Sequence, residues 1–301
     1  MHALDEVIRW PVDAAAVAVV RTGGAATDPG VSVGDPERVF PWASVTKPAT
    51  ALAVLVAVEE GTLALDQPAG PAGSTVRHLL AHASGLGPEA GPPVEVPGRR
   101  RIYSNAGFAA LGRLVEEASG IGFADYLTTG VLEPLGMSAT ALSDQPAAGG
   151  AAAGLTGPLV DLVALGREWA RPTLVSVTTW QDATSVQFAG LAGVLPGYGP
   201  SDPCDWGLGV EIRGSKRPHW TGPSNAPGTY GHFGQSGSFL WVDPVAGVLC
   251  CGLADRPFGV WASRAWPDLA EAVLAEVPPP GAVPGDPPSA VPPPGGSGGH
   301  V

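Results

Sequence analysis

The spacing of apolar and polar residues divides the chain into strand-like segments at both ends and helical segments between them. Segments 14–21 and 31–35 have the apolar, β-branched character of strands and are joined by a glycine-rich turn. Segments 206–214, 237–244 and 247–255 alternate or run apolar in the same way. A short turn separates the last two, which predicts that they pair as an antiparallel hairpin.

Between these strands, apolar residues recur with the period of a helix. Segment 44–60 predicts a buried helix that ends at Gly61, because glycine commonly follows the last helical turn. The glycine- and alanine-rich stretch 147–154 predicts a loop. Further helices are predicted at 75–83, 106–120, 158–170, 176–189 and 262–277, the last of them broken or started at Pro267.

This order predicts an α+β protein in which both ends of the chain contribute to one antiparallel sheet and a helical region is inserted between them. We place the sheet parts at about 10–40 and 205–276 and the helical part at about 62–200, within one domain of residues 1–276. The proline- and glycine-rich segment 277–301 has too few apolar residues for a core, which predicts a disordered tail.

Composition narrows the function. The chain has 301 residues and a net charge of −12, which disfavours nucleic acid or an anionic membrane as a partner. No window is apolar for long enough to span a membrane, and the first residues lack the basic region of a signal peptide. Cys204, Cys250 and Cys251 are interpreted as free thiols. We therefore expect a cytoplasmic protein with a small-molecule substrate, and the sequence does not predict its oligomeric state.

Ser44 and Lys47 are three residues apart, so on a helix they share a face. Pro48 fits only the first turn of a helix, which places Ser44 at the N-terminus, where backbone N–H groups favour a developing anion. A serine needs a neighbouring base to become a nucleophile, and a lysine is that base only if its pKa is lowered. The four residues alone also fit a capping serine beside a solvated lysine.

Other motifs follow in order: "VRHLLAHASGL" (76–86), "YSNAGFAALGRLVEEASG" (103–120), "LEPLGMSAT" (132–140) and "GHFGQSGSFLWVDP" (231–244). Over roughly residues 12 to 276 the set resembles the serine β-lactamase-like superfamily, which includes class C β-lactamases, D-alanyl-D-alanine carboxypeptidases and family VIII-type esterases. The resemblance implies a β-lactamase/transpeptidase-like fold. It also implies that Ser44 is the acylated nucleophile and Lys47 its activator, that Tyr103 exchanges protons with Ser44 and the leaving group, and that Asn105 orients Lys47 or the acyl group.

The third motif of such families corresponds here to His232, Phe233 and Gly234. The resemblance places an oxyanion hole at the backbone N–H groups of Ser44 and Gln235. Related enzymes commonly have Lys-Thr-Gly at this position. A histidine is only partly charged near neutral pH and would hold a substrate carboxylate less firmly than lysine does. This difference favours the esterase-like branch over β-lactam and peptide substrates.

No metal or cofactor is implied, since His78 and His82 have the helical spacing of a metal pair but lack the following glutamate of that motif. The leading hypothesis is a serine hydrolase that acts through an acyl-enzyme on small esters or amide-like acyl compounds. A β-lactamase or D-Ala-D-Ala carboxypeptidase is the alternative within enzymes. A non-catalytic relative that retains the pocket for ligand binding is the alternative outside them.

Overall fold

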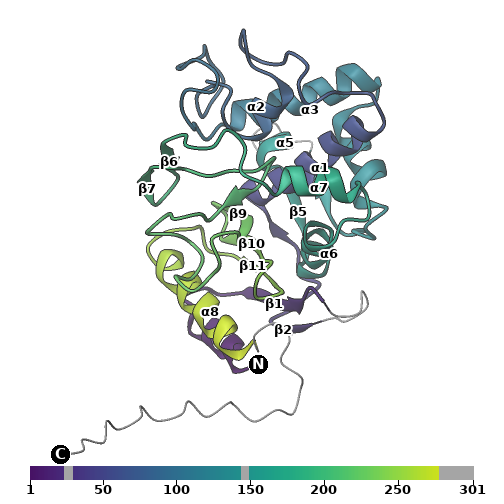
Figure 1. Cartoon of the computed structure of the whole chain (residues 1–301). Helices are drawn as coiled ribbons and strands as arrows, with labels where there is room; N and C mark the ends of the chain where they lie inside the picture. Colours follow the sequence, from purple (N-terminus) through teal and green to yellow (C-terminus); the bar gives the residue numbers. More distant parts are fainter. Residues whose placement is uncertain (24–29, 144–148, 278–301) are drawn as a thin grey trace, which may run out of the picture.

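The computed structural model describes residues 1–23, 30–143 and 149–277 (Figure 1). The predicted turn after the first strand falls partly outside these described residues, as does the start of the 147–154 stretch. The predicted tail lies outside them from residue 278 onward.

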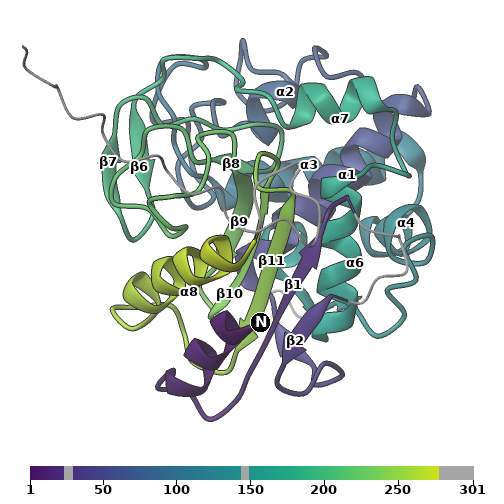
Figure 2. The same ribbon diagram turned by 60° about the horizontal axis from the view of Figure 1, so that its bottom comes forward.

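A six-stranded antiparallel sheet lies at the centre and is built from both ends of the chain, as predicted. Its strand order is β2-β1-β11-β10-β9-β8. N-terminal β1 pairs with C-terminal β11 over its whole length, so the two ends of the chain lie side by side (Figure 2). The strands are β1 (Ala15–Arg21), β2 (Val31–Val33), β8 (Glu211–Ile212), β9 (Tyr230–Gly234), β10 (Ser238–Asp243) and β11 (Val248–Ala254).

The two faces of this sheet bury two separate hydrophobic clusters, because successive side chains of a strand point to opposite faces. Ala18 and Cys251 enter the cluster that includes α6 (Leu159–Ala170). Val17 and Cys250 enter the cluster formed with η1 (His2–Arg9) and α8 (Ala262–Glu276). Figure 2 shows α6 and α8 on opposite sides of the sheet. All three cysteines are free and buried, which agrees with their interpretation as unpaired thiols.

The helical region is centred on α1 (Thr46–Glu59), which is buried on nearly all sides among α3, α4 and α5. Between Pro48 and Val58 its residues are all small or aliphatic, so neighbouring helices approach it from several directions. Among the described residues, no helix combines the length and apolar character needed to cross a bilayer. The remaining elements are η2 (Ala43–Val45), α2 (Val76–Leu80), α3 (Asn105–Ser119), α4 (Phe123–Leu127), η3 (Thr128–Leu132), α5 (Gly150–Ala153), α7 (Val177–Ala183), a small sheet of β3 (Phe40–Pro41), β5 (Leu155–Gly157) and β4 (Ala141–Leu142), and a hairpin of β6 (Gly193–Leu195) and β7 (Gly199–Ser201).

The strand predicted at 206–214 is mostly wrong. Only β8 (Glu211–Ile212) joins the sheet, and the preceding residues form a loop that lies on α1. Leu208 N donates to Ala183 O, and Gly209 N donates to Leu80 O, so these amides are taken by helix ends instead of a strand partner. Gly209 has φ +86°, and a Cβ there would collide with Ala51 of α1. The glycines, which sequence reasoning passed over, allow this close approach.

Three other expectations are corrected. The helix expected at 176–189 ends at Ala183, because Leu208 N bonds to the carbonyl of that residue and the chain turns away. Helix α8 neither breaks nor starts at Pro267. It runs from Ala262, so Pro267 lies inside it. Buried Trp266 fixes this part of the helix by packing against Phe239 and Phe258. Part of the stretch expected to be a loop at 147–154 forms helix α5.

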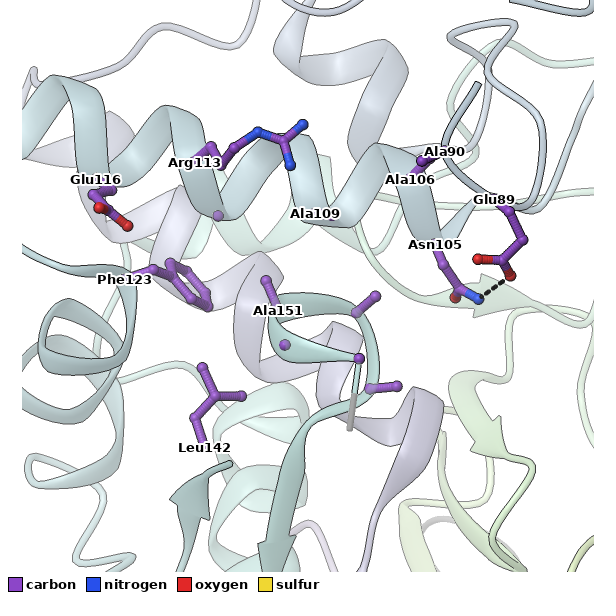
Figure 3. A pocket seen from close by; sticks show the side chains of 15 residues that line it. Glu89, Ala90, Asn105, Ala106, Ala109, Arg113, Glu116, Phe123, Leu142 and Ala151 are labelled. Carbon is purple, nitrogen blue, oxygen red and sulfur yellow. Dashed lines mark hydrogen bonds between the residues drawn. The ribbon is translucent and has the colours of Figure 1, made fainter. Parts of the chain in front are cut away.

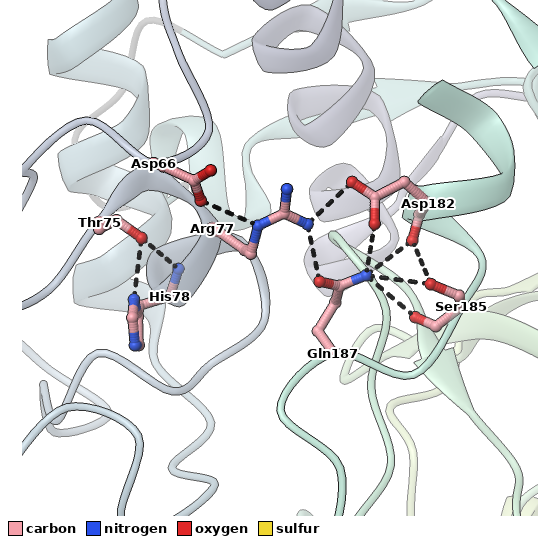
Figure 4. Close-up of polar contacts among 7 residues, drawn as sticks. All are labelled: Asp66, Thr75, Arg77, His78, Asp182, Ser185 and Gln187. Carbon is pink, nitrogen blue, oxygen red and sulfur yellow. Dashed lines mark hydrogen bonds and ion pairs between the residues drawn. The ribbon is translucent and has the colours of Figure 1, made fainter. Parts of the chain in front are cut away.

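Arg77 links helix α2 to the segment around α7 (Figure 4). Its guanidinium donates to Asp182 and Gln187, each at 2.8 Å, and to Asp66 at 3.2 Å. This network joins α2 to the end of α7 and the loop that follows it.

Candidate active site

Ser44 lies on the tight turn η2 that leads directly into α1, as the position of Pro48 predicted. The turn is anchored by Trp42, whose indole N–H donates to Gly157 O at 3.0 Å and whose carbonyl accepts from Ser238 Oγ at 2.6 Å. Ala43 adopts φ +44°, a backbone conformation that residues other than glycine rarely adopt. Several distant segments therefore hold the residue before Ser44 in a strained turn.

Lys47 is fully buried beneath Ser44. Its Nζ lies 3.3 Å from Ser44 Oγ, 2.7 Å from Asn105 Oδ1 and 2.9 Å from Ala152 O. Burial lowers the pKa of Lys47 from 10.5 to about 7, and the charge of Glu89 partly opposes that lowering. A neutral Lys47 donates to Asn105 and Ala152, and its lone pair accepts from the Ser44 hydroxyl.

Tyr103 contacts the same hydroxyl from the other side. Its O–H donates to Ser44 Oγ at 2.7 Å, and Lys47 Nζ lies 4.7 Å from the centre of its ring. The phenol is buried, which raises its pKa, while the hydrogen bond with Ser44 opposes this. Tyr103 is therefore protonated at rest and is a proton donor, whereas Lys47 is the better resting base.

Asn105 is the first residue of α3, and the hydroxyl of the preceding residue, Ser104, caps the helix by accepting from Gly107 N. One side of its amide accepts from Lys47, and the other donates to Glu89 Oε1 at 3.2 Å (Figure 3). The two contacts fix the orientation of the amide. Asn105 also separates the Ser44 pocket from a groove of about 510 Å³ between α3 and α5, which Figure 3 shows.

The end of β9 passes close to the turn that carries Ser44. A Cβ on Gly234 would collide with Trp42 O and lie 3.1 Å from Ser44 N, so only glycine allows this approach. The backbone at Gln235 follows directly. Ser44 N and Gln235 N are thus on adjacent backbone segments. Ser44 N also belongs to the first amides of a helical turn, which have no hydrogen-bond acceptor within that turn.

His232 lies on β9 and is buried. Its Nδ1 bonds to Phe233 O at 2.7 Å, so we assign the proton to that nitrogen, and Nε2 has no partner among the described residues. Burial, followed by the charge of Lys47, lowers the pKa of His232 to about 3. The partial charge expected from sequence is therefore wrong, and the imidazole is neutral.

The pocket beside Ser44 has a volume of about 190 Å³. Six of the site residues predicted from sequence lie at this pocket or next to it. Five line it, namely Ser44, Tyr103, Asn105, His232 and Gln235, and Lys47 lies beneath Ser44. Glu211 is a wall residue that sequence reasoning missed. Its signal was a single acidic residue in the apolar run 206–212. The remaining wall residues are Leu195, Pro196, Trp206 and Phe233.

Neither histidine of the helical pair is placed as a metal ligand. His82 is buried, and its Nδ1 accepts from Ser104 N at 3.1 Å. His78 bonds through Nδ1 to Thr75 at 2.9 Å, as Figure 4 also shows. Within residues 1–23, 30–143 and 149–277, no three or more His, Cys, Asp or Glu side chains are grouped to hold a metal ion.

Comparison with known proteins gives matches over most of the chain. The family model described as Beta-lactamase matches residues 6–275. The crystal structure of a beta-lactamase from Mycobacterium bovis is 53% identical with a TM-score of 0.87, and the match covers 91% of this chain and 99% of that one. This agreement confirms the α+β, β-lactamase/transpeptidase-like fold that the sequence predicted.

Two further relatives are more distant. Penicillin-binding protein 4* of Bacillus subtilis (strain 168) is 31% identical over 135 residues, and the match covers 34% of this chain and 30% of that protein's length. EstCE1, a hydrolase with promiscuous acyltransferase activity, is 17% identical with a TM-score of 0.72. That match covers 90% of this chain and 96% of EstCE1, and it shows a shared fold.

Proposed function

This chain belongs to the Beta-lactamase family of serine hydrolases, and from that premise we propose that Ser44 is its acylated nucleophile. One observation supports the proposal above others. The Ser44 hydroxyl contacts both a buried lysine with a pKa of about 7 and the O–H of a protonated tyrosine. The alternative interpretation of the motif, a capping serine beside a solvated lysine, does not fit, because Lys47 is buried.

In the acylation step, Ser44 Oγ attacks the substrate carbonyl while its proton passes to the neutral amine of Lys47. The backbone N–H groups of Ser44 and Gln235 stabilise the oxyanion that forms, and Gly234 keeps the two segments close. Tyr103 gives its proton to the leaving group and is reprotonated from the Lys47 ammonium. Water then attacks the acyl-enzyme and gives its proton to the Lys47–Tyr103 pair, which passes a proton to Ser44 Oγ as the acyl–oxygen bond breaks and the acid is released.

We propose small esters or amide-like acyl compounds as substrates. No lysine or arginine is among the described residues that line the pocket, and His232 is neutral. A substrate carboxylate, such as that of a penicillin or of a D-Ala-D-Ala peptide, therefore has no cation to bind there. The relationship to a Mycobacterium bovis beta-lactamase favours β-lactam turnover as the second candidate.

Intact mass after incubation with a fluorophosphonate probe tests the role of Ser44. We expect one adduct on the wild-type chain, mapped to Ser44, and none on Ser44→Ala, with both proteins showing the same thermal unfolding. Full labelling of Ser44→Ala would refute the assignment. Absence of labelling on wild-type protein, where a known serine hydrolase labels completely, would support a non-catalytic relative that binds ligand in the same pocket.

The substrate proposal is tested by measuring kcat/KM for neutral esters and for penicillins with protein that the fluorophosphonate probe labels. We expect turnover of small neutral esters, with the kcat/KM for a penicillin at least about tenfold lower, because a penicillin carboxylate meets no lysine or arginine among the described residues that line the Ser44 pocket. A penicillin turned over faster than every ester would establish the second candidate instead.

A further inference from the structure

The end of helix α2 places a histidine where the backbone favours glycine. Two hydrogen bonds close the helix: Ala83 N donates to His78 O at 2.8 Å, and His82 N donates to Leu79 O at 3.2 Å. In a helix ending of this kind, the residue in the left-handed conformation is usually glycine. Here that residue is His82, with φ +55°. The conformation is therefore held by the surrounding structure against the preference of the residue itself.

The side chain of His82 is also placed at a cost to stability. It is buried, and its Nδ1 accepts from Ser104 N, so we assign its proton to Nε2. Nε2 has no hydrogen-bond partner among the described residues, and a buried donor without an acceptor is unfavourable. Burial, followed by the charge of Lys47, lowers the pKa of His82 well below 6.5, so the ring is neutral. A residue that is unfavourable in both backbone and side chain is typical of a functional site.

His82 holds the backbone on both sides of Tyr103. Ile102 N donates to the carbonyl of His82 at 2.9 Å, and Ser104 N donates to its Nδ1 at 3.1 Å. Tyr103 lies between these two residues, outside any helix or strand, and α3 begins only at Asn105. Two hydrogen bonds to one residue therefore fix a backbone segment that regular secondary structure does not hold.

The imidazole ring of His82 also packs against the phenol ring of Tyr103. The two ring centres are 4.7 Å apart. Trp206 contacts both rings, with its centre 4.6 Å from that of His82 and 5.9 Å from that of Tyr103. The phenol O–H reaches Ser44 Oγ at 2.7 Å. Proton transfer needs this kind of hydrogen-bond reach, so a shift of the ring would impair it.

We propose that His82 is the positioning residue of Tyr103, and that its carbonyl, its Nδ1 and its ring together hold the phenol in reach of Ser44 and of the leaving group. The proposal rests on the roles proposed above for Ser44 and Tyr103. His82 is not among the described residues that line the Ser44 pocket, so it acts through Tyr103 and not on the substrate. Its side chain should matter most where the leaving group takes the Tyr103 proton as its bond to the acyl carbon breaks.

The test measures kcat/KM on the full chain for two esters of one acid. The leaving group of ethyl butyrate needs a proton, whereas that of 4-nitrophenyl butyrate departs as a stable anion. Glycine suits φ +55°, so His82→Gly removes the side chain without straining the helix ending. We expect His82→Gly to lower kcat/KM for the ethyl ester at least about tenfold more than for the nitrophenyl ester, as the loss of a general acid does.

Two further variants separate positioning from a structural role. Tyr103→Phe should show the same selective loss, and adding His82→Gly to it should leave the ratio of the two kcat/KM values unchanged. His78→Asn alters a histidine of α2 that bonds to Thr75, and it should keep the wild-type ratio. Equal losses on both esters in His82→Gly, or a further selective loss in the double variant, would overturn the proposal.

His82→Asn keeps the proposal testable if the glycine variant does not fold. Asparagine tolerates the left-handed conformation and offers an acceptor to Ser104 N but lacks the ring, so its selective loss should be smaller and of the same sign. Equal losses on both esters in this variant would also overturn the proposal. A His82 variant that fluorophosphonate labels at Ser44, with an unchanged ester ratio, refutes this inference alone. A wild-type chain that does not label refutes the nucleophile, and this inference with it.

Discussion

The rate of Ser44 acylation should follow the ionisation of Lys47, so that kcat/KM rises as the pH is raised through about 7. Lys47 can accept the Ser44 proton only as a neutral amine. With the ordinary pKa of 10.5, roughly one lysine in a thousand would be neutral at pH 7.5, whereas a pKa of about 7 leaves more than half neutral. The lowering of the Lys47 pKa corresponds to roughly 5 kcal/mol by which burial disfavours the ammonium relative to the neutral amine.

The assay is kcat/KM for a neutral ester between pH 5 and 9, with the substrate chosen so that it does not titrate. We expect a tenfold rise per pH unit below about 7 and a plateau above it. The other groups that face Lys47 do not produce this limb: burial keeps His82 and His232 neutral and Tyr103 protonated over that range. A flat profile, or a midpoint above pH 9, would refute the assignment of Lys47 as the base.

Glu89 provides an internal control, because its charge raises the pKa of Lys47. Glu89→Gln should therefore move the midpoint to lower pH and increase the rate at pH 6. Glu95→Gln removes a charge from the same loop at a residue that does not act on Lys47, and it should leave the midpoint in place. Identical shifts in both variants would indicate a general change of surface charge.

The same ionisation predicts a stability effect with a defined sign. Between about pH 7 and 10.5 the unfolded chain carries the Lys47 proton and the folded chain does not. Since the unfolded state binds more protons, the free energy of unfolding rises with pH across this window. Lys47→Met should remove that part of the rise in urea unfolding measured at pH 7 and pH 10. A rise of unchanged size in the variant would show that other groups produce it.

Three further substitutions test the surrounding structure. Gly234→Ala should reduce kcat by about 100-fold or more, because its Cβ would lie 3.1 Å from Ser44 N and displace an oxyanion donor, while fluorescence-monitored unfolding checks that the fold remains. Arg101→Met should lower the free energy of unfolding in urea by about 3 kcal/mol. The buried guanidinium donates to Cys204 O at 3.0 Å and to Gln187 O at 2.7 Å, and its removal leaves both carbonyls without a donor. An unchanged urea midpoint would contradict this. Arg77→Ala should lower it by only about 1 kcal/mol, and the difference from wild type should shrink in 1 M NaCl, because its ion pairs with Asp66 and Asp182 are partly exposed.

The sequence predicted the sheet well because its pattern is local. The apolar, β-branched run in 14–21 and the hairpin at 237–255 specify strands whichever partners they find, and joining the two ends then follows from the order of elements. It failed at 206–214, where apolar alternation is present but Gly207 brings the chain against the end of α7 and Gly209 brings it against α1. Only the position of α1 in the folded protein decides between these outcomes, and that position is not encoded in the segment itself.

The same limit applies to the site. The residues with a motif were predictable: Ser44 and Lys47 share a short helical spacing, and the ordered motifs that resemble the superfamily implied the role of Tyr103. Ala152 contributes only a backbone carbonyl to Lys47, and no residue pattern marks a carbonyl. Glu211 reaches the pocket through the pairing of β8 with β9, which is set by tertiary contacts. Contributions that depend on strand neighbours or on backbone atoms are therefore found only in the folded structure.

The activation of Ser44 and the packing of the core are one physical event in this fold. Lys47 has a low pKa because α1 is surrounded by apolar side chains, not because a neighbouring cation repels its proton. The small and aliphatic residues after Pro48 let α3 and α5 pack closely on α1, and this packing buries Lys47. Water that entered around α1 would stabilise the ammonium and remove the base while the sheet stayed folded. Core substitutions that loosen α1 should therefore reduce activity at neutral pH before they unfold the protein, and raising the pH should restore it.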